Sequence, residues 1–335
     1  MTSGDGGAGG VDAPAGGADA PAGGAPLERP VPADWLALRE PADVRARDEA
    51  ADALLGPLAA ALAERAGPQG GDRAPRPPGA GGPHVLDVGA GTGAGARWLA
   101  PRLRARLGRE ARWTLLDHDA DLLARAGAAP GATGRGARRV LGDLSRAAAL
   151  LRGTGAPGDG ATDGPGRPDL VTATALLDLL RPAEVEVLAG AVVDAGVPLL
   201  VALSVTGEVR LDPPDPLDAE LAAAFDAHQR RGGRLGPDAV APVVERLGSA
   251  GLQVLTAPSP WRLGTASPSG GGGDADLLAA WTRGRAEAAV EHDEALAVPA
   301  ARWSRAREEQ ARAGALGAVV GHVDLLALPG VTRGG

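Results

Sequence analysis

The sequence predicts an α/β protein built on a doubly wound sheet. Short apolar segments alternate with helical patterns between residues 84 and 205, an order typical of parallel sheets with crossover helices. The segment 198–205 is continuously apolar, as expected for a strand that is covered on both faces. A glycine-rich turn separates the first apolar segment from a helical pattern. With 335 residues, the chain is long enough to bury a complete core.

Composition narrows the possible functions. Lys, Asn, Ile, Tyr and Cys are absent and a single Phe is present, which we interpret as the mark of a high-GC genome. Without Cys, the chain has no disulfide framework, no thiolate zinc site and no cysteine nucleophile. No other cluster of side chains predicts a metal site. The net charge of −8 argues against a nucleic-acid partner, because phosphate binding needs clustered positive charge.

The chain also lacks the signals of membrane and secreted proteins. No apolar run approaches the roughly 20 residues that span a bilayer. The first residues contain neither the basic region nor the apolar region of a secretory signal. We therefore expect a soluble, cytoplasmic protein without a membrane partner.

The chain divides into four parts by composition. Residues 1–30 repeat Gly, Ala, Asp and Pro and are expected to form a disordered tail. Residues 31–66 predict N-terminal helices, and residues 67–83, rich in Gly and Pro, predict a linker. Residues 84–330 contain the strand and helix patterns and form the main domain.

Two helices are predicted before the linker. Asp34 can cap the first, which Pro41 ends or bends, and the second runs from about residue 42 to residue 66. These helices could fold over a cofactor pocket or simply pack on the sheet. Arg39 could bind a carboxylate of a ligand, or it could be an ordinary surface arginine.

The stretch that begins at residue 84 predicts a nucleoside-binding corner. Residues 84–88 form an apolar strand that contains Asp87 near its end, and a helix is expected over 94–107. Glycine lacks the Cβ atom that would keep a ligand away from the backbone. The Gly-x-Gly-x-x-Ala spacing, taken alone, also fits dinucleotide-binding oxidoreductases. The turn contains the candidate cofactor-binding residues Gly89, Ala90, Gly91 and Gly93.

A second candidate site follows the second predicted strand, residues 112–116. Asp117 comes directly after this strand, 24 positions beyond Gly93. A carboxylate at this place in a nucleoside-binding unit accepts hydrogen bonds from the ribose hydroxyls. Such charge-assisted bonds contribute about 1.5–3 kcal/mol each. The neighbouring His118 is expected to flank the adenosine.

Further candidates follow the third and fourth predicted strands. The third strand, residues 138–141, leads to Asp143, which could accept a bond from an adenine amino group, and to Leu144, which offers an apolar flank. The fourth strand, residues 169–174, ends at Thr174, another candidate cofactor contact. A helix over residues 182–195 leads from there to the fifth strand.

Residues 84–205 together resemble the class I S-adenosylmethionine-dependent methyltransferases. The resemblance implies a seven-stranded sheet, parallel except for its last strand, and S-adenosyl-L-methionine as the cofactor that donates the methyl group. A suitably spaced series of motifs is more specific than the glycine corner alone. The motifs, in chain order, are Asp87 to Gly93, Asp117, Asp143, and the strand 169–174 with the apolar turn 176–180 behind it.

An NAD(P)-dependent oxidoreductase of the Rossmann type is the main alternative. It explains the glycines, Ala94 and Asp117, but not Asp87 or Asp143. A Tyr-x-x-x-Lys pair for hydride transfer is also excluded, because the chain contains neither Tyr nor Lys. A binding module that holds S-adenosylmethionine without turnover is a further alternative.

The second half of the chain is expected to form the acceptor side. Residues 252–256 and 318–327 predict the last two strands of the sheet. Helical elements are predicted within 208–250 and within 274–316, the latter as an insertion before the last strand. With the N-terminal helices, we expect them to roof an acceptor pocket.

Two residues are candidates for catalysis. Methyl transfer is an in-line displacement, so the protein mainly has to align donor and acceptor. A base is needed only where the acceptor must lose a proton. His228 is a candidate because imidazole titrates near neutrality, and Asp178 is a second candidate. The alternatives are a hydrogen-bonded helix histidine and a helix-capping carboxylate.

The acceptor class follows by elimination. The fourth strand is not followed by an Asn/Asp-Pro-Pro-aromatic turn, so it does not resemble the methyltransferases that act on planar amines of adenine or glutamine. Pyrimidine carbon is excluded by the absence of Cys, and large RNA is disfavoured by the acidic charge. We therefore expect a small-molecule acceptor, methylated on oxygen or nitrogen in preference to carbon; the oligomeric state is not predicted.

Overall fold

The computed structural model describes residues 31–66, 82–126, 136–154, 166–268 and 273–330. The predicted disordered tail and nearly all of the predicted linker lie outside these ranges. Within them, strands and helices alternate along the chain as the sequence predicts.

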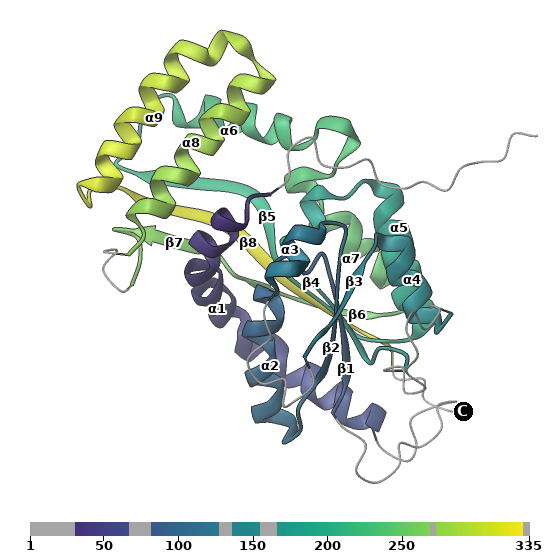
Figure 1. The fold of residues 1–335 in the computed structure, drawn as a ribbon. Helices are drawn as coiled ribbons and strands as arrows, with labels where there is room; N and C mark the ends of the chain where they lie inside the picture. Colours follow the sequence, from purple (N-terminus) through teal and green to yellow (C-terminus); the bar gives the residue numbers. More distant parts are fainter. Residues whose placement is uncertain (1–30, 67–81, 127–135, 155–165, 269–272, 331–335) are drawn as a thin grey trace, which may run out of the picture.

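A twisted central sheet carries helices on both faces (Figure 1). All neighbouring strands are parallel except for β8, the last strand in the chain, which runs antiparallel between β5 and β6. The predicted fold class, the doubly wound, mostly parallel sheet of the class I methyltransferases, is thereby confirmed. The order across the sheet is β3 (Arg138–Leu141), β2 (Arg112–Asp117), β1 (His84–Val88), β4 (Leu170–Thr174), β5 (Leu199–Asp212), β8 (Gly317–Leu328) and β6 (Gln253–Pro258).

The sheet carries an extension that the sequence does not predict. The fifth strand is expected to end near Val205, but β5 continues to Asp212 and stays paired with β8. An additional short strand, β7 (Trp261–Gly264), pairs with the first residues of β8. These strand segments project away from the sheet toward the upper left of Figure 1. Residues 208–212, expected to lie in a helical region, are therefore strand.

Three helices pack on this extension and form with it what we call the helical lobe. They share a small core that includes Leu221, Ala289 and Trp303. Two of them lie between β7 and β8 in the chain and correspond to the predicted insertion. The helices are α6 (Asp218–Gln229), α8 (Ala275–His292) and α9 (Ala297–Arg312).

Two layers of helices bury the faces of the sheet. The first layer consists of α4 (Leu144–Arg152), α5 (Pro182–Ala195) and α7 (Val240–Ser249). The second consists of α1 (Ala33–Ala66), α2 (Ala94–Leu107) and α3 (Ala120–Arg125). Leu, Val and Ala make up nearly all of both cores, and Trp98 and Trp113 add bulk to the second. Short 3-10 helices complete the structure: η1 (Leu177–Leu179), η2 (Arg231–Gly233), η3 (Gly236–Asp238) and η4 (Glu294–Leu296).

The N-terminal segment is one helix, and the prediction of two helices is wrong. The helix α1 continues through Pro41, although a proline inside a helix typically costs about 3 kcal/mol. Tertiary contacts on both sides of the proline offset this cost. Ala42 and Ala46 pack in a cluster with Trp261 of β7 and Trp281 of α8, and Leu54 and Leu58 pack on the sheet.

Polar contacts attach α1 to α2. Arg97 of α2 donates to the Glu40 carboxylate at 2.6 and 2.8 Å. The Trp98 indole donates to Asp48 at 3.0 Å, and Arg102 pairs with the same carboxylate at 2.5 Å. Acidic residues of α1 thus neutralise much of the arginine-rich surface of α2, so α1 is held against the sheet.

A buried carboxylate organises the point where β5 leaves the sheet. Leu203 has a left-handed backbone with φ 57°, within an irregularity between Val201 and Ser204. Asp324 of β8 accepts the Leu203 amide at 2.8 Å and the Ser259 hydroxyl at 2.5 Å. Burial raises the pKa of Asp324 to about 6, against the weaker opposing effect of these two hydrogen bonds.

The raised pKa of Asp324 predicts how stability depends on pH. The unfolded chain loses this proton near pH 4, the native protein only near pH 6. Between these values the native state binds more protons, so stability falls as pH rises and the loss persists above pH 6. Asp324→Asn keeps an acceptor oxygen and removes the charge. We expect it to be about 1–2 kcal/mol more stable than the wild type at about pH 7.5, with no gain at about pH 4.

Urea unfolding of both proteins across this pH range measures the difference. The control is Asp276→Asn, at an exposed carboxylate in the first turn of α8, which should not change the pH profile. A stability difference between wild type and Asp324→Asn that is the same at every pH would contradict the raised pKa.

Candidate functional site

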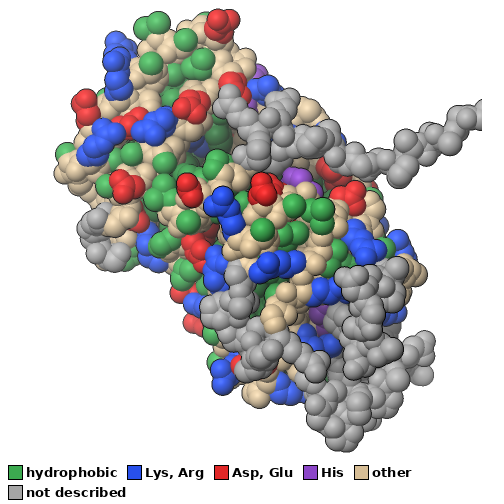
Figure 2. All heavy atoms as spheres, in the orientation of Figure 1, with side chains coloured by type: hydrophobic (Ala, Val, Ile, Leu, Met, Phe, Trp, Pro, Cys, Tyr) green, Lys and Arg blue, Asp and Glu red, His purple; other side chains and the backbone are tan. Residues whose placement is uncertain are grey.

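A cavity of about 330 Å³ lies at the carboxyl ends of the parallel strands. Open α/β sheets bind their ligands at this edge. On the face shown in Figure 2, the surface is hollowed between the helical lobe and the sheet, with acidic and basic side chains interspersed around it. The lining includes Trp35, Leu36, Arg39 and Asp43 of α1, Asp87 to Gly95 in part, Asp117 to Asp119, Thr174 to Leu179 in part, and Phe225, Gln229, Trp281 and Arg285 of the lobe.

The glycine corner forms the floor of the cavity. Gly89 and Gly91 have left-handed backbones, with φ 65° and 53°. A Cβ atom at Gly89 would lie 2.9 Å from a methyl group of Leu176, and one at Gly91 would touch Leu36 of α1. The corner is therefore closely covered on both sides. Ala90 also lines the cavity, whereas Gly93 begins α2 and is not part of the lining.

Asp117 connects the corner to the end of β2. Its Oδ2 atom accepts the Gly91 amide at 2.7 Å, and its Oδ1 atom accepts the Asp119 amide at 2.9 Å. An ionised carboxylate has about four acceptor positions, so these two amides leave acceptor capacity, although His118 Nδ1 also lies 3.3 Å from Oδ1. Asp117 is 6% exposed and lines the cavity beside the exposed His118.

Asp87 lies deeper, at the end of β1. It is almost fully buried and accepts the Thr172 hydroxyl at 2.7 Å. Burial raises the pKa of Asp87 to about 6, although the Thr172 hydrogen bond and the Arg47 guanidinium both act to lower it. Thr174 closes the same region, because a Cβ atom at Gly95 would lie 3.0 Å from its hydroxyl. These side chains surround the start of α2.

Asp143 and Leu144 lie outside the cavity lining. Asp143 caps α4, since its Oδ1 atom accepts the amides of Ser145 and Arg146 at 3.0 and 3.2 Å. These bonds and the one from the Ser145 hydroxyl lower the pKa of Asp143. Leu144 is half-buried in the first turn of the helix. Their predicted adenine contacts stay predictions.

Asp178 is part of the cavity wall, on η1 after β4. The chain reaches it through Ala175, whose φ of 50° is unusual for a residue with a Cβ atom, and such backbone strain concentrates at functional sites. Burial raises the pKa of Asp178 to about 6, with Arg39 and Arg234 opposing the shift. A carboxyl group with this pKa can accept a proton near neutral pH.

The structure does not bring His228 into the cavity. Its Nε2 atom lies 3.1 Å from Glu291 of α8, and it is absent from the lining. The neighbouring helix positions Phe225 and Gln229 line the cavity instead. Since successive residues of a helix point about 100° apart, a histidine next to Gln229 faces elsewhere.

Another part of the lining is a group of linked polar side chains, which the sequence did not identify as a unit. Arg39 makes a two-point contact with Asp43, at 2.9 and 3.2 Å, and lies 5.1 Å from the centre of the Trp261 ring. The Trp261 indole donates to the same Asp43 carboxylate at 3.0 Å. Arg39 was a candidate from sequence, but its partner Asp43 was not.

His322 completes this part of the lining, beside the Trp261 ring at 5.1 Å between ring centres. Its Nδ1 atom lies 3.1 Å from the Val320 carbonyl, which can only accept, so Nδ1 carries the proton. Burial and the Arg39 charge lower the pKa of His322 to about 3. The ring is neutral at neutral pH, with Nε2 as an acceptor.

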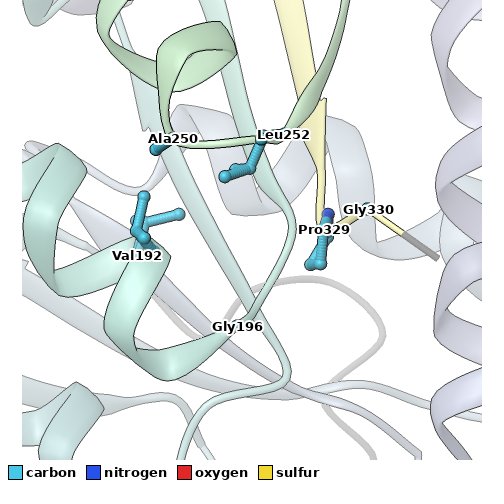
Figure 3. A pocket seen from close by; sticks show the side chains of 8 residues that line it. Val192, Gly196, Ala250, Leu252, Pro329 and Gly330 are labelled. Carbon is cyan, nitrogen blue, oxygen red and sulfur yellow. The ribbon is translucent and has the colours of Figure 1, made fainter. Parts of the chain in front are cut away.

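A second hollow, of about 290 Å³, lies at the opposite edge of the sheet (Figure 3). It is formed where α5 and α7 end, beside the start of β6 and the end of β8. Figure 3 shows Val192 and Leu252 as its largest labelled side chains. The lining is aliphatic residues, glycine and proline, without a titratable side chain, so it offers no chemistry comparable to that of the first cavity.

Comparisons with known proteins find similar solved structures. No family model and no curated protein sequence matches the chain. Similar solved structures include a mycolic acid cyclopropane synthase complexed with SAH and CTAB, at 14% identity and a TM-score of 0.37, covering 73% of this chain and 78% of that one. Magnesium protoporphyrin IX methyltransferase from Synechocystis PCC 6803, with bound SAH, is 14% identical with a TM-score of 0.36, covering 64% and 79%.

Human N-acetylserotonin methyltransferase in complex with SAM is 17% identical with a TM-score of 0.32, covering 52% of this chain and 44% of that one. These similarities are weak, and the strand order identifies the fold. Among the described residues, no helix has both the length and the apolar composition to cross a membrane.

The glycine corner predicts a difference between two alanine substitutions. Gly89 and Gly108 both have φ 65°, but a Cβ atom at Gly108 meets nothing within 4 Å. Gly108→Ala should cost about 1–2 kcal/mol, the usual penalty of a left-handed alanine. Gly89→Ala should cost about 1–3 kcal/mol more, because Leu176 has to move. Urea unfolding measures both values, and equal costs would show that the corner is not tightly covered.

Proposed function

We propose that this protein is an S-adenosylmethionine-dependent methyltransferase that acts on a small molecule. The observation that supports this most is the extent of the cavity. It runs from the glycine corner and Asp117 to aromatic and charged side chains of the helical lobe. One cavity can therefore hold a nucleoside at one end and a second small molecule at the other.

The residues of the corner fit the donor. Asp117 has acceptor positions for ribose hydroxyls, and the left-handed glycines leave the floor without side chains. Asp87 is suited to an ammonium group, since a nearby cation would stabilise its charged form. Asp143 is proposed for the adenine amino group through Oδ2, because its capping bonds all use Oδ1. The bound donor supplies an electrophilic methyl group on a sulfonium.

The sheet favours this function over the oxidoreductase alternative. Dinucleotide-binding Rossmann domains usually have the strand order 3-2-1-4-5-6. Here the antiparallel β8 lies between β5 and β6. The binding-module alternative differs from the proposal only in turnover, which labelled methyl transfer would detect.

The chain contributes alignment and a proton acceptor. Orientation of two reactants can account for about 7–11 kcal/mol of a barrier. For an acceptor oxygen or nitrogen that has to lose a proton, Asp178 is the proposed base, because its pKa of about 6 makes it an ionised but proton-accepting group at neutral pH. His322, with a pKa of about 3, is too weak a base and is proposed to accept a hydrogen bond through Nε2.

Donor binding tests the proposal directly. Calorimetry should detect S-adenosylhomocysteine binding and no tight NAD binding. Asp117→Ala should weaken S-adenosylhomocysteine at least about tenfold, the loss expected for one charge-assisted hydrogen bond. Asp121→Ala, at an exposed residue of α3, is the control and should bind normally. Tight binding of NAD alone, or an unchanged affinity in Asp117→Ala, would contradict the donor site.

Asp178 predicts a pH dependence of turnover. With an acceptor found by screening small-molecule extracts, transfer of a labelled methyl group should rise with pH through about 6, as Asp178 loses its proton. Asp178→Asn should lower kcat at least about 100-fold and remove this step, with little change in KM. His228→Ala should keep the wild-type rate and pH profile. Loss of activity in His228→Ala with normal turnover in Asp178→Asn would reverse the assignment.

A further inference from the structure

A buried arginine of the helical lobe has no counter-ion in the described part of the chain. Arg285, on α8, is 6% exposed and lines the cavity. Its guanidinium makes no hydrogen bond or ion pair with the residues described, and its buried Nη2 atom lacks a partner. Burial lowers the pKa of Arg285 to about 10, so the side chain stays charged at neutral pH.

Another arginine of the lobe shows how this fold satisfies a buried cation that serves packing. Arg307, on α9, is 1% exposed. Its Nη2 atom donates to both oxygens of Asp218, at 2.7 and 2.8 Å, and Nη1 donates to the Pro213 carbonyl at 2.7 Å, while its Nε atom has no partner among the described residues. A buried charge without such partners is strongly unfavourable. Arg285 differs from Arg307 in having no hydrogen bond or ion pair with the described residues, and it differs from the buried Arg47 in lining the cavity.

The carboxylate of Asp226 does not supply the missing partner. Asp226 of α6 attracts the Arg285 charge, but no ion pair or hydrogen bond joins the two groups. Burial raises the pKa of Asp226, and its Oδ1 atom is also without a partner. The field of Asp226 helps to keep Arg285 protonated, while the N–H groups of Arg285 stay available.

Aromatic rings hold the guanidinium in place. Its central carbon lies 4.1 Å from the centre of the Phe225 ring and 4.9 Å from that of Trp281. Phe225 comes from α6, and Trp281 lies one turn before Arg285 on α8. Guanidinium groups stack on aromatic faces and bond through the N–H groups of their edge. The guanidinium thus contacts two rings, and all three side chains line the cavity.

The other arginine of the cavity is already neutralised. Arg39 pairs with Asp43 through two contacts, so it carries little charge toward a ligand. The lining also contains apolar side chains, among them Trp35, Leu203 and Val205, and the polar groups Asp178 and His322. Among the described residues of the lining, Arg285 is the cation without an ion-pair partner.

We propose that Arg285 binds a carboxylate of the methyl acceptor, and that the acceptor is a small organic acid with an apolar body. A planar carboxylate can lie in the plane of the guanidinium edge and accept two parallel bonds. That this ligand is the methyl acceptor rests on the proposed function, whereas the binding of a carboxylate at Arg285 does not.

Paired acids and amides test the site. The probes are benzoate, phenylacetate and indole-3-acetate with their neutral amides, titrated calorimetrically into the full chain with and without saturating S-adenosylhomocysteine. At least one acid should bind about ten- to a hundredfold more tightly than its amide, the ratio expected for charged hydrogen bonds. If no acid exceeds its amide, the proposal is wrong. A preference for phenyl phosphate over every acid would overturn the carboxylate assignment.

Variants locate the preference. Arg285→Gln should bind each acid and its amide equally, whereas Arg283→Gln should retain the wild-type ratio. Arg283 lies on the same helix, is exposed and pairs with Glu308, so it is a matched control. A retained preference in Arg285→Gln would place the anion elsewhere. The comparison of acid with amide in the wild type needs no variant, so it decides the proposal even if Arg285→Gln does not fold.

The outcomes also separate this inference from the proposed function. Absence of S-adenosylhomocysteine binding with a clear acid preference would refute the methyltransferase and keep the anion site. Normal S-adenosylhomocysteine binding with no acid preference would refute the anion site and leave the proposed methyltransferase function intact.

Discussion

The hydrogen bond from the Gly91 amide to Asp117 is the contact on which the site depends. It joins the turn after β1 to the end of β2 and holds the backbone in its left-handed path. The amide of Ala90 donates to the Leu116 carbonyl at 3.0 Å in the same place. The start of α2 follows from this path, and α2 in turn carries Arg97, which holds α1 over the corner through Glu40. A single carboxylate thus supports both the floor of the cavity and, through α2, one of its walls.

Local patterns in the sequence were sufficient for the central sheet. The strands β1 to β4 and the helices α2 and α5 agree closely with prediction, because their signals are short: an apolar run, a glycine turn, Pro182 at a helix start. The lengths of β5 and β8 could not be predicted from such local patterns. Beyond Val205 the pattern becomes alternating and polar, and only pairing with β8 and β7 keeps it extended. The predicted helix break at Pro41 was wrong for the same reason. Contacts with residues distant in sequence outweigh the tendency of proline to end a helix.

The candidate residues show the same division. Asp87, Asp117 and Asp178 lie in the cavity, as expected of side chains that follow parallel strands. His228 was a candidate but lies outside the cavity lining, whereas Arg285 was not a candidate and lies in it. The position of each depends on which side of α6 or α8 faces the cavity. The apolar residues of α8 lie on several sides, and buried charges occur among them, so its sequence does not mark the inner face. Arginine is also the only long basic residue in the chain, which hides a functional one among many.

The helical insertion between β7 and β8 has an evolutionary consequence. Its helices supply Trp281 and Arg285 to the cavity but contribute nothing to the glycine corner. The insertion is connected to β7 and β8, which are hydrogen-bonded into the sheet. The sequence of the insertion can therefore change while these strands keep their positions. Mutations in this segment can change which molecule is selected at one end of the cavity without disturbing the other end. The fold thereby separates the part of the cavity that is built on the sheet from the part that is built on the insertion.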